Sequence, residues 1–474
     1  MDDTRIESDS QVAAAKPANR IADFIGDDGA FAGPAPKRQP RKRRERGMRF
    51  ITAAAIAEHL LKESHFARQA DGKLFVYLDG YYQPKGDDEV RRLVKSLLKR
   101  IKRAAEWSSK LANEVVEFIA IDAPPLREKP HLKWLNVRNG LLNVETRELR
   151  RHTPEYRCSV QIPVKYDPSA ACPNNEKFVN DVFSPDARHL AWEIIAWLML
   201  PDMSIQMSVL LLGEGENGKS AWLRLIRSFL GRANVSALSL QKIEKDKFAA
   251  YRLVGKLANI CADLPTEHLD GVSTFKGLTG KYELTAENKF QTSFEFEPFV
   301  RLVFSANDPP RAKSANHAFF RRWLVVPFEA VIPDEKRIDR DKLDAMLAAP
   351  AELSGVLNKA IDALPDIRRN GAFTTPESCR AALSRFQQST DPLMVWLESN
   401  TLLNASAFVV KTELVEAYNR HAAAKGVTPA TAHRMTKAVK LLTNEDHTQK
   451  TVNGRVEWVY QGIDMNCPAA KMAA

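Results

Sequence analysis

The sequence has few cysteines and no apolar run long enough to cross a membrane. Its cysteines are odd in number, scattered and never spaced as C-x-x-C: Cys158, Cys172, Cys261, Cys379 and Cys467. Such a pattern gives neither a disulfide framework nor a zinc site, and it suits a reducing cytosol. The longest apolar stretch, around 191–203, contains Glu193 and is too short to span a bilayer. The opening residues, MDDTRIESDS, are acidic and polar, unlike a signal peptide. We therefore expect a cytoplasmic protein without membrane contact.

Length and charge bound the class of protein. A chain of 474 residues is too long for one ordinary core, which predicts about two to four domains. The net charge is +10, with 44% hydrophobic and 27% charged residues. A basic balance suits a polyanionic partner such as nucleic acid, although charge bears on association rather than on fold.

Residues 1–47 lack the periodic apolar spacing of a folded segment, and we expect them to be disordered. They lead into the basic run KRQPRKRRERGMR at 37–49. Two interpretations stay open: a solvated tail, or an arm that binds nucleic acid without sequence preference. An arm that neutralised four phosphates would lose affinity with salt at a log–log slope of about −3 to −4.

Residues 48–185 are expected to form an N-terminal α+β domain. Helical spacing begins after Arg49 and returns at 87–120. Two hairpins are predicted, one turning at Asp79-Gly80 and one around Asn139-Gly140, whose glycine would take the positive φ of a tight turn. No chemical constellation is visible in this region, so we interpret it as scaffold.

Residues 186–370 are expected to form the core, and they contain a nucleotide-binding motif. The stretch LLLGEGENGKSAWLRLI at 210–226 fits G-x-x-x-x-G-K-[ST], in the order strand, glycine-rich loop, helix. Backbone N–H groups and the helix N-terminus would hold phosphate oxygens. Lys219 would reach the β- and γ-phosphates and Ser220 would ligate Mg²⁺. The residues expected to bind ATP are Gly213, Glu214, Gly215, Glu216, Asn217, Gly218, Lys219 and Ser220.

Two further apolar stretches end in polar residues suited to the same nucleotide. KLANICADLP ends near Asp263, whose carboxylate can help to hold Mg²⁺ or polarise an attacking water. Asp263 acts either alone or together with Glu267. FVRLVFSANDPP contains Asn307, which either orients water against the γ-phosphate or simply initiates a turn.

A pair of arginines, Arg321 and Arg322, lies between apolar runs in AFFRRWLVVPFE. Paired arginines beside a buried strand are often salt-bridged scaffold. Alternatively, one of them contacts the γ-phosphate held by a neighbouring subunit, a contact that contributes roughly 10³–10⁵ in rate.

Residues 380–465 are expected to form a C-terminal winged helix, after a linker at 365–378. Its third helix is predicted to begin with Thr428 as N-cap and Pro429 at N1, and its wing is a hairpin on Asn453-Gly454. This segment either binds duplex DNA, contacts protein or presents a solvated face. The basic residues on its third helix and wing are His433, Arg434, Lys437, Lys440, Lys450 and Arg455.

Taken in order, GEGENGKS, LANICADLP, TGKYELTAENKFQTSFEFEP, FSANDPP and FFRRWLVVPF resemble the superfamily-three helicases. The resemblance is closest to the phage and plasmid primase–helicase family with poxvirus-type relatives, and it covers roughly residues 50–460. The preceding stretch, NGLLNVETRELRRHTPEYRCSVQIPVKYDPSAACP, resembles the domain that precedes the helicase in that family.

The resemblance implies an α/β fold with an AAA+-like P-loop ATPase core that assembles as a ring, usually a homohexamer. ATP would lie between subunits and single-stranded DNA would pass through the central pore. By position, Lys219 and Ser220 match the Walker A residues, Asp263 the Walker B acid and Asn307 sensor 1. Arg321 or Arg322 matches the arginine finger. The residues matching the DNA-gripping hairpin are Lys289, with Lys281 and Phe290 flanking it.

One departure from the family pattern concerns the N-terminus. Larger members carry a primase or polymerase domain ahead of the helicase, whereas only the disordered-looking residues 1–47 precede the matching region here. We therefore expect no primase activity in this chain and, as a partner, a separate primase or polymerase.

The sequence thus leads to one functional hypothesis and one rival. The hypothesis is an ATP-dependent, ring-forming DNA helicase that uses Mg²⁺ and replicates a phage, plasmid or integrated element, with 3′→5′ travel implied by the family. The rival is an ATP-switched origin-binding protein that assembles on DNA without processive unwinding.

Overall fold

The computed structural model describes residues 51–465 apart from Glu128, 266–268, Asp270, Lys281, 289–291, 311–316, Asp334 and Lys336. Every described element belongs to one unit of the chain, Ile51–Ala474. The expected basic tail lies outside the described residues, as do Glu267, Lys281, Lys289 and Phe290.

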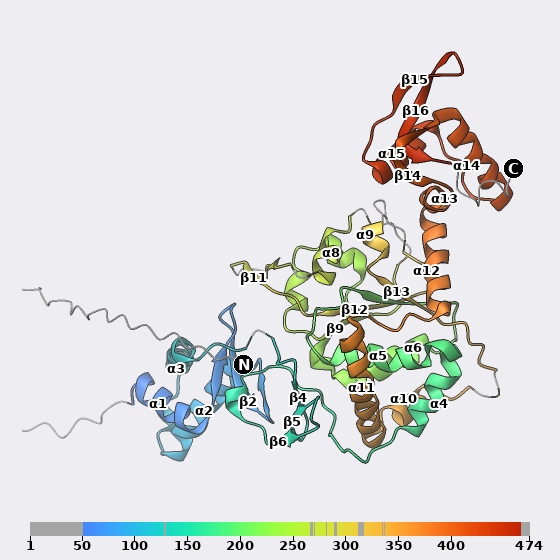
Figure 1. Cartoon of the computed structure of the whole chain (residues 1–474). Helices are drawn as coiled ribbons and strands as arrows, with labels where there is room; N and C mark the ends of the chain where they lie inside the picture. Colours follow the sequence, from blue (N-terminus) through green and yellow to red (C-terminus); the bar gives the residue numbers. More distant parts are fainter. Residues whose placement is uncertain are drawn as a thin grey trace, which may run out of the picture. The chain divides into compact units, whose positions relative to one another are not determined.

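The first part of the described chain packs helices against a small antiparallel sheet in the order β1-β2-β3 (Figure 1). Its elements are α1 (Ala53–Glu63), β1 (Phe66–Arg68), β2 (Leu74–Leu78), β3 (Tyr81–Gln83), α2 (Gly86–Arg100) and α3 (Ser109–Asp122). Helix α1 begins where the Thr52 side chain accepts a hydrogen bond from the N–H of Ala55. The predicted β2–β3 turn is confirmed, because Asp79 and Gly80 both have positive φ, 52° and 88°.

A second antiparallel sheet contains β4 (Trp134–Val137), β5 (Gly140–Asn143) and β6 (Leu149–Arg150). The predicted hairpin is present, but the expected positive φ at Gly140 is wrong. Gly140 is the first residue of β5 and pairs with Val137. A Cβ atom at this position would lie 2.3 Å from the backbone oxygen of Arg150. The glycine therefore serves the close approach of β6 rather than the turn.

The central element is a parallel sheet of five strands in the order β13-β7-β12-β9-β8. Its strands are β7 (Ser208–Leu212), β8 (Val235–Ser236), β9 (Ala258–Cys261), β12 (Arg301–Ala306) and β13 (Trp323–Pro327). These strands read as nearly continuous apolar runs because both faces of the sheet are covered. Along β7, Val209 and Leu211 join one buried cluster, while Leu210 joins the other.

Helices cover the two faces of this sheet. The first buried cluster contains residues of α4 (Pro173–Val182), α5 (Arg188–Met199), α6 (Lys219–Leu230), α10 (Arg340–Leu347) and α11 (Pro350–Asn370). The second contains residues of α7 (Leu240–Lys245), α8 (Ser273–Thr279), α9 (His317–Phe320) and α12 (Glu377–Thr390). An antiparallel pair, β10 (Leu284–Ala286) and β11 (Phe294–Phe296), is separate from this sheet. Short 3₁₀ turns, η1 to η5, lie at 104–106, 154–156, 185–187, 232–234 and 250–253.

The predicted linker at 365–378 is only partly correct. Helix α11 continues through Pro365 and ends at Asn370, where Gly371 caps it with a φ of 61°. The helix persists because Leu364 and Ile367 are buried in the core, so tertiary packing outweighs the lost backbone hydrogen bond of the proline. The connection to α12 is therefore shorter than the sequence suggested.

The last part of the described chain contains α13 (Pro392–Asn400), β14 (Leu402–Val410), α14 (Lys411–Lys425), α15 (Ala432–Thr443), β15 (Thr448–Val452) and β16 (Arg455–Asp464). The strands form an antiparallel sheet in the order β14-β16-β15. The hairpin on Asn453-Gly454 is confirmed, with φ values of 49° and 80°. Strand β14 was not expected from the sequence.

The predicted start of the third helix in this part is wrong by three residues. Thr431, not Thr428, caps α15 by accepting a hydrogen bond from the N–H of Arg434. The segment before it is held in place by other contacts: the Tyr418 hydroxyl donates to the Thr428 oxygen, and the Asn419 side chain bonds both backbone groups of Ala430. Within the described residues, no helix has the length and apolar character needed to cross a membrane.

Candidate nucleotide-binding site

The glycine-rich loop leaves β7 between its two neighbours, β12 and β13, and leads into α6. At Gly213 a Cβ atom would lie 2.1 Å from the Phe328 oxygen, so only glycine fits this position. Gly218 has a φ of 91° and caps α6. Gly215 faces open space, because a Cβ atom at this position would have no other atom within 4 Å. Protein packing does not require a glycine there, which is consistent with space kept for a ligand.

Lys219, the first residue of α6, folds back onto the loop. Its ammonium donates hydrogen bonds to the Gly213 oxygen at 2.5 Å, the Glu214 oxygen at 2.7 Å and Asn217 Oδ1 at 3.0 Å. The residue is only 5% exposed. Burial lowers the pKa of the Lys219 amine, and the negative charge of Asp263 opposes this effect. The ammonium of Lys219 thus donates its hydrogen bonds to oxygens of the loop itself. The side chain would have to turn outward to contact an anion.

Asn217 braces the loop against the segment after β13. Its side-chain N–H groups donate to the Glu214 oxygen at 2.6 Å and to the Phe328 oxygen at 2.5 Å. Because Asn217 also accepts from Lys219, it links the loop, the lysine and the sheet. The structure therefore gives this motif position a bracing role within the loop.

Asp263 and Asn307 lie at the same edge of the sheet as the loop. Asp263 follows β9, has a φ of 54° and donates its N–H to Ser305 Oγ at 3.2 Å on β12. The N–H of Gly213 bonds the oxygen of Ala306 at 3.3 Å, so the loop starts beside Asn307. Both Asp263 and Asn307 are exposed. The carboxyl ends of parallel strands thereby bring loop, carboxylate and amide together, where ligands of open α/β sheets bind.

A cavity of about 600 Å³ opens beside the loop. Its walls come from the loop, from Asn307, from the segment after β13 and from the last turns of α12. The lining side chains of α12 are Ala382, Arg385, Phe386 and Ser389. This volume lies within the roughly 300–1,000 Å³ typical of small-molecule sites.

Two arginines of this cavity were missed by sequence reasoning. Arg337 forms an ion pair with Glu216 of the loop at 2.6 Å, and Arg385 forms one with Glu329 at 2.8 Å. Neither belongs to a motif, and both reach the cavity only through the fold. These exposed ion pairs place two guanidinium groups in the lining of the cavity.

Arg321 and Arg322 lie at the opposite edge of the sheet from the loop. Trp323, directly after them, pairs with Ser208 at the start of β7, and the loop begins after Leu212 at the other end. The strand separates the two edges by about 13 Å. Arg321 is exposed, whereas Arg322 is 7% exposed and donates to the Ala318 oxygen at 2.5 Å. Burial, and then the charge of Arg321, lower the pKa of Arg322, with Tyr282 opposing.

The predicted DNA-contacting residues of the C-terminal part fall into two groups. Arg434 forms an ion pair with Asp391 at 3.2 Å and Lys440 one with Asp446 at 2.7 Å, so both have partners within the chain. Lys437 and Arg455 are exposed and make no ion pair among the described residues. His433 is exposed on α15, and Lys450 lies over the Phe408 ring at 4.6 Å.

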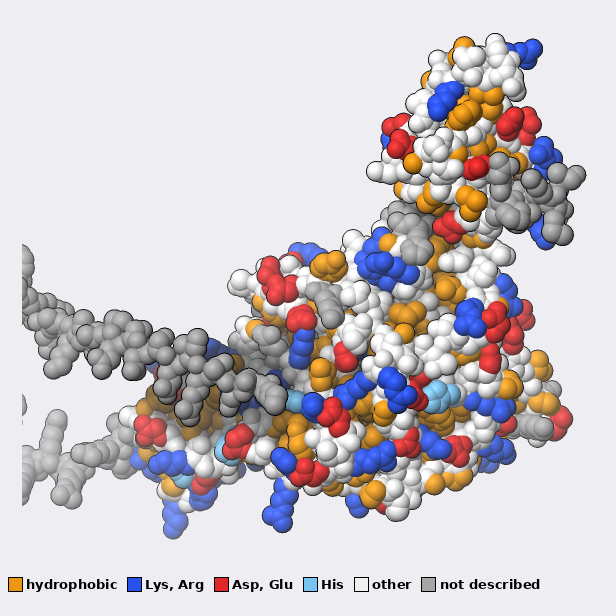
Figure 2. Space-filling model, in the orientation of Figure 1, with side chains coloured by type: hydrophobic (Ala, Val, Ile, Leu, Met, Phe, Trp, Pro, Cys, Tyr) orange, Lys and Arg blue, Asp and Glu red, His pale blue; other side chains and the backbone are white. Residues whose placement is uncertain are grey.

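Exposed hydrophobic side chains accompany these basic residues: Leu402, Leu403, Phe408, Leu441, Val456 and Trp458. In Figure 2, orange, blue and red side chains are interspersed over the face in view, including its β14–β16 part. Among the described residues, no group of three or more His, Cys, Asp or Glu side chains is arranged to hold a metal ion.

Comparisons with known proteins agree with this architecture. Residues 53–184 match the family described as D5 N terminal like, and residues 211–322 match a family of unknown function, DUF5906. Over 276 residues the chain is 21% identical to "Putative helicase 184R" of Invertebrate iridescent virus 6. It is 22% identical over 323 residues to "Putative helicase 121R" of Invertebrate iridescent virus 3. The chain is similar to helicase-named viral proteins. The alignments cover 52% and 58% of this chain but only 28% and 33% of those relatives, about a third of their length.

Solved structures show the same fold at low sequence identity. The apo structure of the NrS-1 C-terminal region matches with a TM-score of 0.51 and 11% identity, covering 86% of this chain and 99% of that one. A second form of the same region matches with a TM-score of 0.50. At this identity the likeness concerns the fold alone. The chain is thus similar in sequence to helicase-named viral proteins and similar in fold to the NrS-1 C-terminal region, with a mixed α/β fold and a parallel sheet.

Proposed function

We propose that this chain is an ATP-dependent DNA helicase that works as a ring, with an AAA+-like P-loop core and a C-terminal winged helix. The observation that carries the proposal is the grouping at one sheet edge of the glycine-rich loop, Lys219, Asp263 and Asn307. A loop of this pattern, between a buried strand and a helix, binds nucleotide phosphates. The cavity beside it has room for the rest of the nucleotide.

Each residue of this edge has a specific role in the proposed reaction. Lys219 exchanges its loop carbonyls for the β- and γ-phosphates of ATP, which releases the carbonyls of Gly213 and Glu214. Asn307 orients a water against the γ-phosphate, and Asp263 polarises that water or holds the ion. Asn217 keeps the loop attached to the segment after β13 during the exchange.

The donor set at this edge fits Mg²⁺. Ser220 is exposed in the first turn of α6. The Asp263 carboxylate is also exposed and lies close enough to raise the pKa of the Lys219 amine against the effect of burial. A hydroxyl, a carboxylate and phosphate oxygens are hard ligands of the kind that magnesium prefers. Magnesium would neutralise charge on the phosphates, while Ser220 and Asp263 hold it in place.

The position of the arginine pair supports assembly. Because Arg321 lies at the sheet edge opposite its own loop, it is suited to reach the nucleotide of a neighbouring subunit rather than its own. Its exposure favours it over Arg322, which is buried and bonded to Ala318. We assign Arg321 as the finger and Arg322 as the residue that supports it. A ring, most simply a homohexamer, repeats this contact around a closed cycle.

The proposed DNA contacts lie in two places. The antiparallel pair β10–β11, with Leu284 opposite Phe296, frames the chain segment that contains Lys289 and Phe290. In the proposed ring this hairpin faces the pore and grips one strand, with 3′→5′ travel and replication of a mobile element as implied by the resemblance. Lys437 on α15 and Arg455 on the wing are the exposed candidates for duplex contact.

The test of the proposed function is ATP hydrolysis by the full chain, measured with and without single-stranded DNA. We expect Mg²⁺-dependent turnover that single-stranded DNA stimulates and that Lys219→Ala abolishes. Slow turnover that DNA does not change, together with a sequence-specific footprint, would instead indicate the origin-binding switch.

A further inference from the structure

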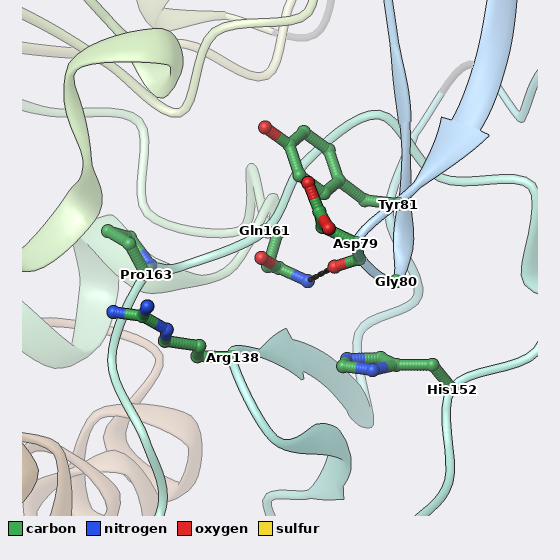
Figure 3. A pocket seen from close by; sticks show the side chains of 7 residues that line it. All are labelled: Asp79, Gly80, Tyr81, Arg138, His152, Gln161 and Pro163. Atoms are coloured by element: carbon green, nitrogen blue, oxygen red, sulfur yellow. Dashed lines mark hydrogen bonds between the residues drawn. The ribbon is translucent and has the colours of Figure 1, made fainter.

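A second cavity, of about 630 Å³, lies in the N-terminal part and shares no lining residue with the cavity beside the glycine-rich loop. It opens between the tips of the β2–β3 and β4–β5 hairpins. Its lining residues are Asp79, Gly80, Tyr81, Arg138, His152, Gln161 and Pro163 (Figure 3). No sequence motif marks a site here, because these residues come from separate turns and strand ends.

The walls of this cavity are fixed by hydrogen bonds. The buried Asn136 side chain donates to the Gly80 oxygen at 3.0 Å and accepts from Gln161 Nε2 at 3.2 Å. Gln161 Nε2 also donates to the Asp79 oxygen at 3.0 Å, the bond drawn in Figure 3. Both hydrogens of the Gln161 amide nitrogen are therefore used. Its oxygen has no hydrogen-bond partner among the described residues and remains an acceptor.

His152 presents a second acceptor. Its Nε2 lies 2.8 Å from the backbone oxygen of Val137, which can only accept, so Nε2 carries the proton. In the neutral ring, Nδ1 is then left with a lone pair. The ring packs directly on Gly80, where a Cβ atom would lie 2.5 Å from Nδ1. Gly80 thus meets two needs: the positive φ of the turn and the close approach of the imidazole.

One cationic side chain, that of Arg138, lines the cavity. Arg138, at the tip of the β4–β5 turn, is exposed and forms neither an ion pair nor a side-chain hydrogen bond with any described residue. In Figure 3 its guanidinium extends toward Pro163, across the mouth from Asp79. Burial and the charge of Asp79 raise the pKa of Tyr81, which keeps its hydroxyl protonated and able to donate. The lining therefore offers a cation, a hydroxyl donor and several acceptors.

The wall that contains Gln161 and Pro163 rests on the C-terminal end of α6. The Asn234 side chain donates to the backbone oxygen of Gln161 at 2.8 Å and to the backbone oxygen of Leu230 at 2.7 Å. A Cβ atom at Gly231 would lie 2.8 Å from Pro163 Cδ. Because α6 carries Lys219 at its other end, this cavity and the loop are braced by one helix. The wall is therefore built into the core and does not depend on a free loop.

We propose that this cavity binds one unpaired nucleotide of a nucleic-acid strand. Arg138 contacts the phosphate, and Gln161 Oε1 and His152 Nδ1 accept hydrogen bonds from the N–H groups of the base. The volume accommodates a base with its sugar and phosphate. An unpaired base is favoured because its whole Watson–Crick edge is free and the base can leave the stack to enter a cavity, whereas a paired base has that edge occupied and stays in the stack. This binding does not depend on ATP hydrolysis, so the proposal stands apart from the proposed function.

The test compares two arginine variants of the full chain in a Lys219→Ala background without nucleotide. Arg138→Ala removes the cation of the cavity, and Arg151→Ala removes an exposed arginine that does not line it. The probe is a fluorescent single-stranded DNA 12-mer, titrated at several salt concentrations. We expect Arg138→Ala to weaken binding about tenfold and Arg151→Ala less than twofold. The log–log salt slope should fall by about 0.7 in the first variant, as for one lost phosphate contact on a single strand.

Further titrations distinguish a nucleotide within a single strand from a free nucleotide and from a duplex. A free deoxynucleoside monophosphate and a blunt duplex are titrated on the same variants. Equal losses for Arg138→Ala and Arg151→Ala would overturn the proposal. Dependence on Arg138 for the monophosphate alone, or for the duplex as much as the single strand, would overturn the assignment to an unpaired strand. None of these outcomes changes whether the wild-type chain hydrolyses ATP.

Discussion

The backbone oxygen of Arg322 accepts hydrogen bonds from both the N–H and the hydroxyl of Ser208, at 2.7 and 2.9 Å. Ser208 is the first residue of the strand that ends in the glycine-rich loop. The bond therefore fixes the arginine pair at one edge of the sheet and the loop at the other. The glycine-rich loop and the exposed Arg321 thus lie at opposite ends of β7, which is the arrangement that the proposed ring with shared sites needs.

Replacing Lys219 by alanine should abolish ATP turnover while the fold persists. The lysine is the cation nearest the phosphates in the proposed complex, and loss of one such group costs about 10²–10³ in rate. Steady-state ATP hydrolysis and far-ultraviolet circular dichroism measure the two effects. Lys177→Ala, at an exposed lysine of α4, is the matched control and should keep wild-type turnover. ATP hydrolysis by Lys219→Ala at the wild-type rate would show that the loop takes no part in the reaction.

Arg321→Ala and Arg322→Ala should differ. Arg321→Ala should fold normally and lose roughly 10³ in turnover, because the exposed guanidinium is assigned to the neighbouring nucleotide. Arg322→Ala should lower the melting temperature, since the buried side chain donates to the Ala318 oxygen, with an expected cost of about 1 kcal/mol. Thermal melting and ATP hydrolysis separate these effects.

Mixing experiments test whether the arginine acts between subunits. In a mixture of Arg321→Ala and Lys219→Ala chains, some interfaces combine an intact loop with an intact arginine. Activity should therefore reappear in the mixture although each variant alone is inactive. If mixtures stay as inactive as the separate proteins, the arginine does not act on a neighbour.

Arg337→Ala should weaken nucleotide binding about tenfold, since a charge-assisted contact of about 1.5 kcal/mol is lost. Arg337 lines the cavity and is paired with Glu216 of the loop, so a bound phosphate or ribose can replace that carboxylate. Titration with a fluorescent ATP analogue measures the change. Arg340→Ala removes an exposed arginine that does not line the cavity and is the control. Equal affinities in the two variants would exclude Arg337 from the site.

The buried thiols predict a pH dependence. Burial raises the pKa of Cys158, Cys172 and Cys379 from about 9 to about 12. A pKa raised in the folded state contributes stability that is complete below pH 9 and is lost as the pH rises toward 12. Urea midpoints should therefore be flat from pH 7 to about 9 and fall above it.

Alkylation gives an independent reading of the same thiols. At pH 8, iodoacetamide should label the half-buried Cys261 faster than the three buried cysteines, because the thiolate is the reactive form. Peptide mapping by mass spectrometry measures each site, and unfolding in guanidinium should equalise the described thiols. Rapid native labelling of Cys158 would contradict its burial.

The sequence was most informative where chemistry is contiguous. The residues Gly213 to Ser220 form one uninterrupted motif, and Asp263 and Asn307 were found because each follows an apolar strand. Parallel strands then bring these ends together. The tight turns at Asp79-Gly80 and Asn453-Gly454 were likewise set by local backbone preference.

Features that depend on distant packing could not be read from the sequence. Gly140 is required by the approach of Arg150, not by a turn, and Pro365 stays in a helix because its neighbours are buried. Arg337 reaches the cavity beside the glycine-rich loop, and Arg138 the second cavity, only through the fold. The ion pairs of Arg434 and Lys440 likewise depend on where Asp391 and Asp446 lie.

Strand displacement tests the central claim most directly. Two duplexes that differ only in carrying a 3′ or a 5′ single-stranded tail are incubated with the full chain, ATP and Mg²⁺, with Lys219→Ala as control. Displacement from the 3′-tailed duplex alone, absent in Lys219→Ala, is the predicted result. Tight binding to one duplex sequence with no displacement from either substrate would contradict a helicase and favour an ATP-switched origin-binding protein.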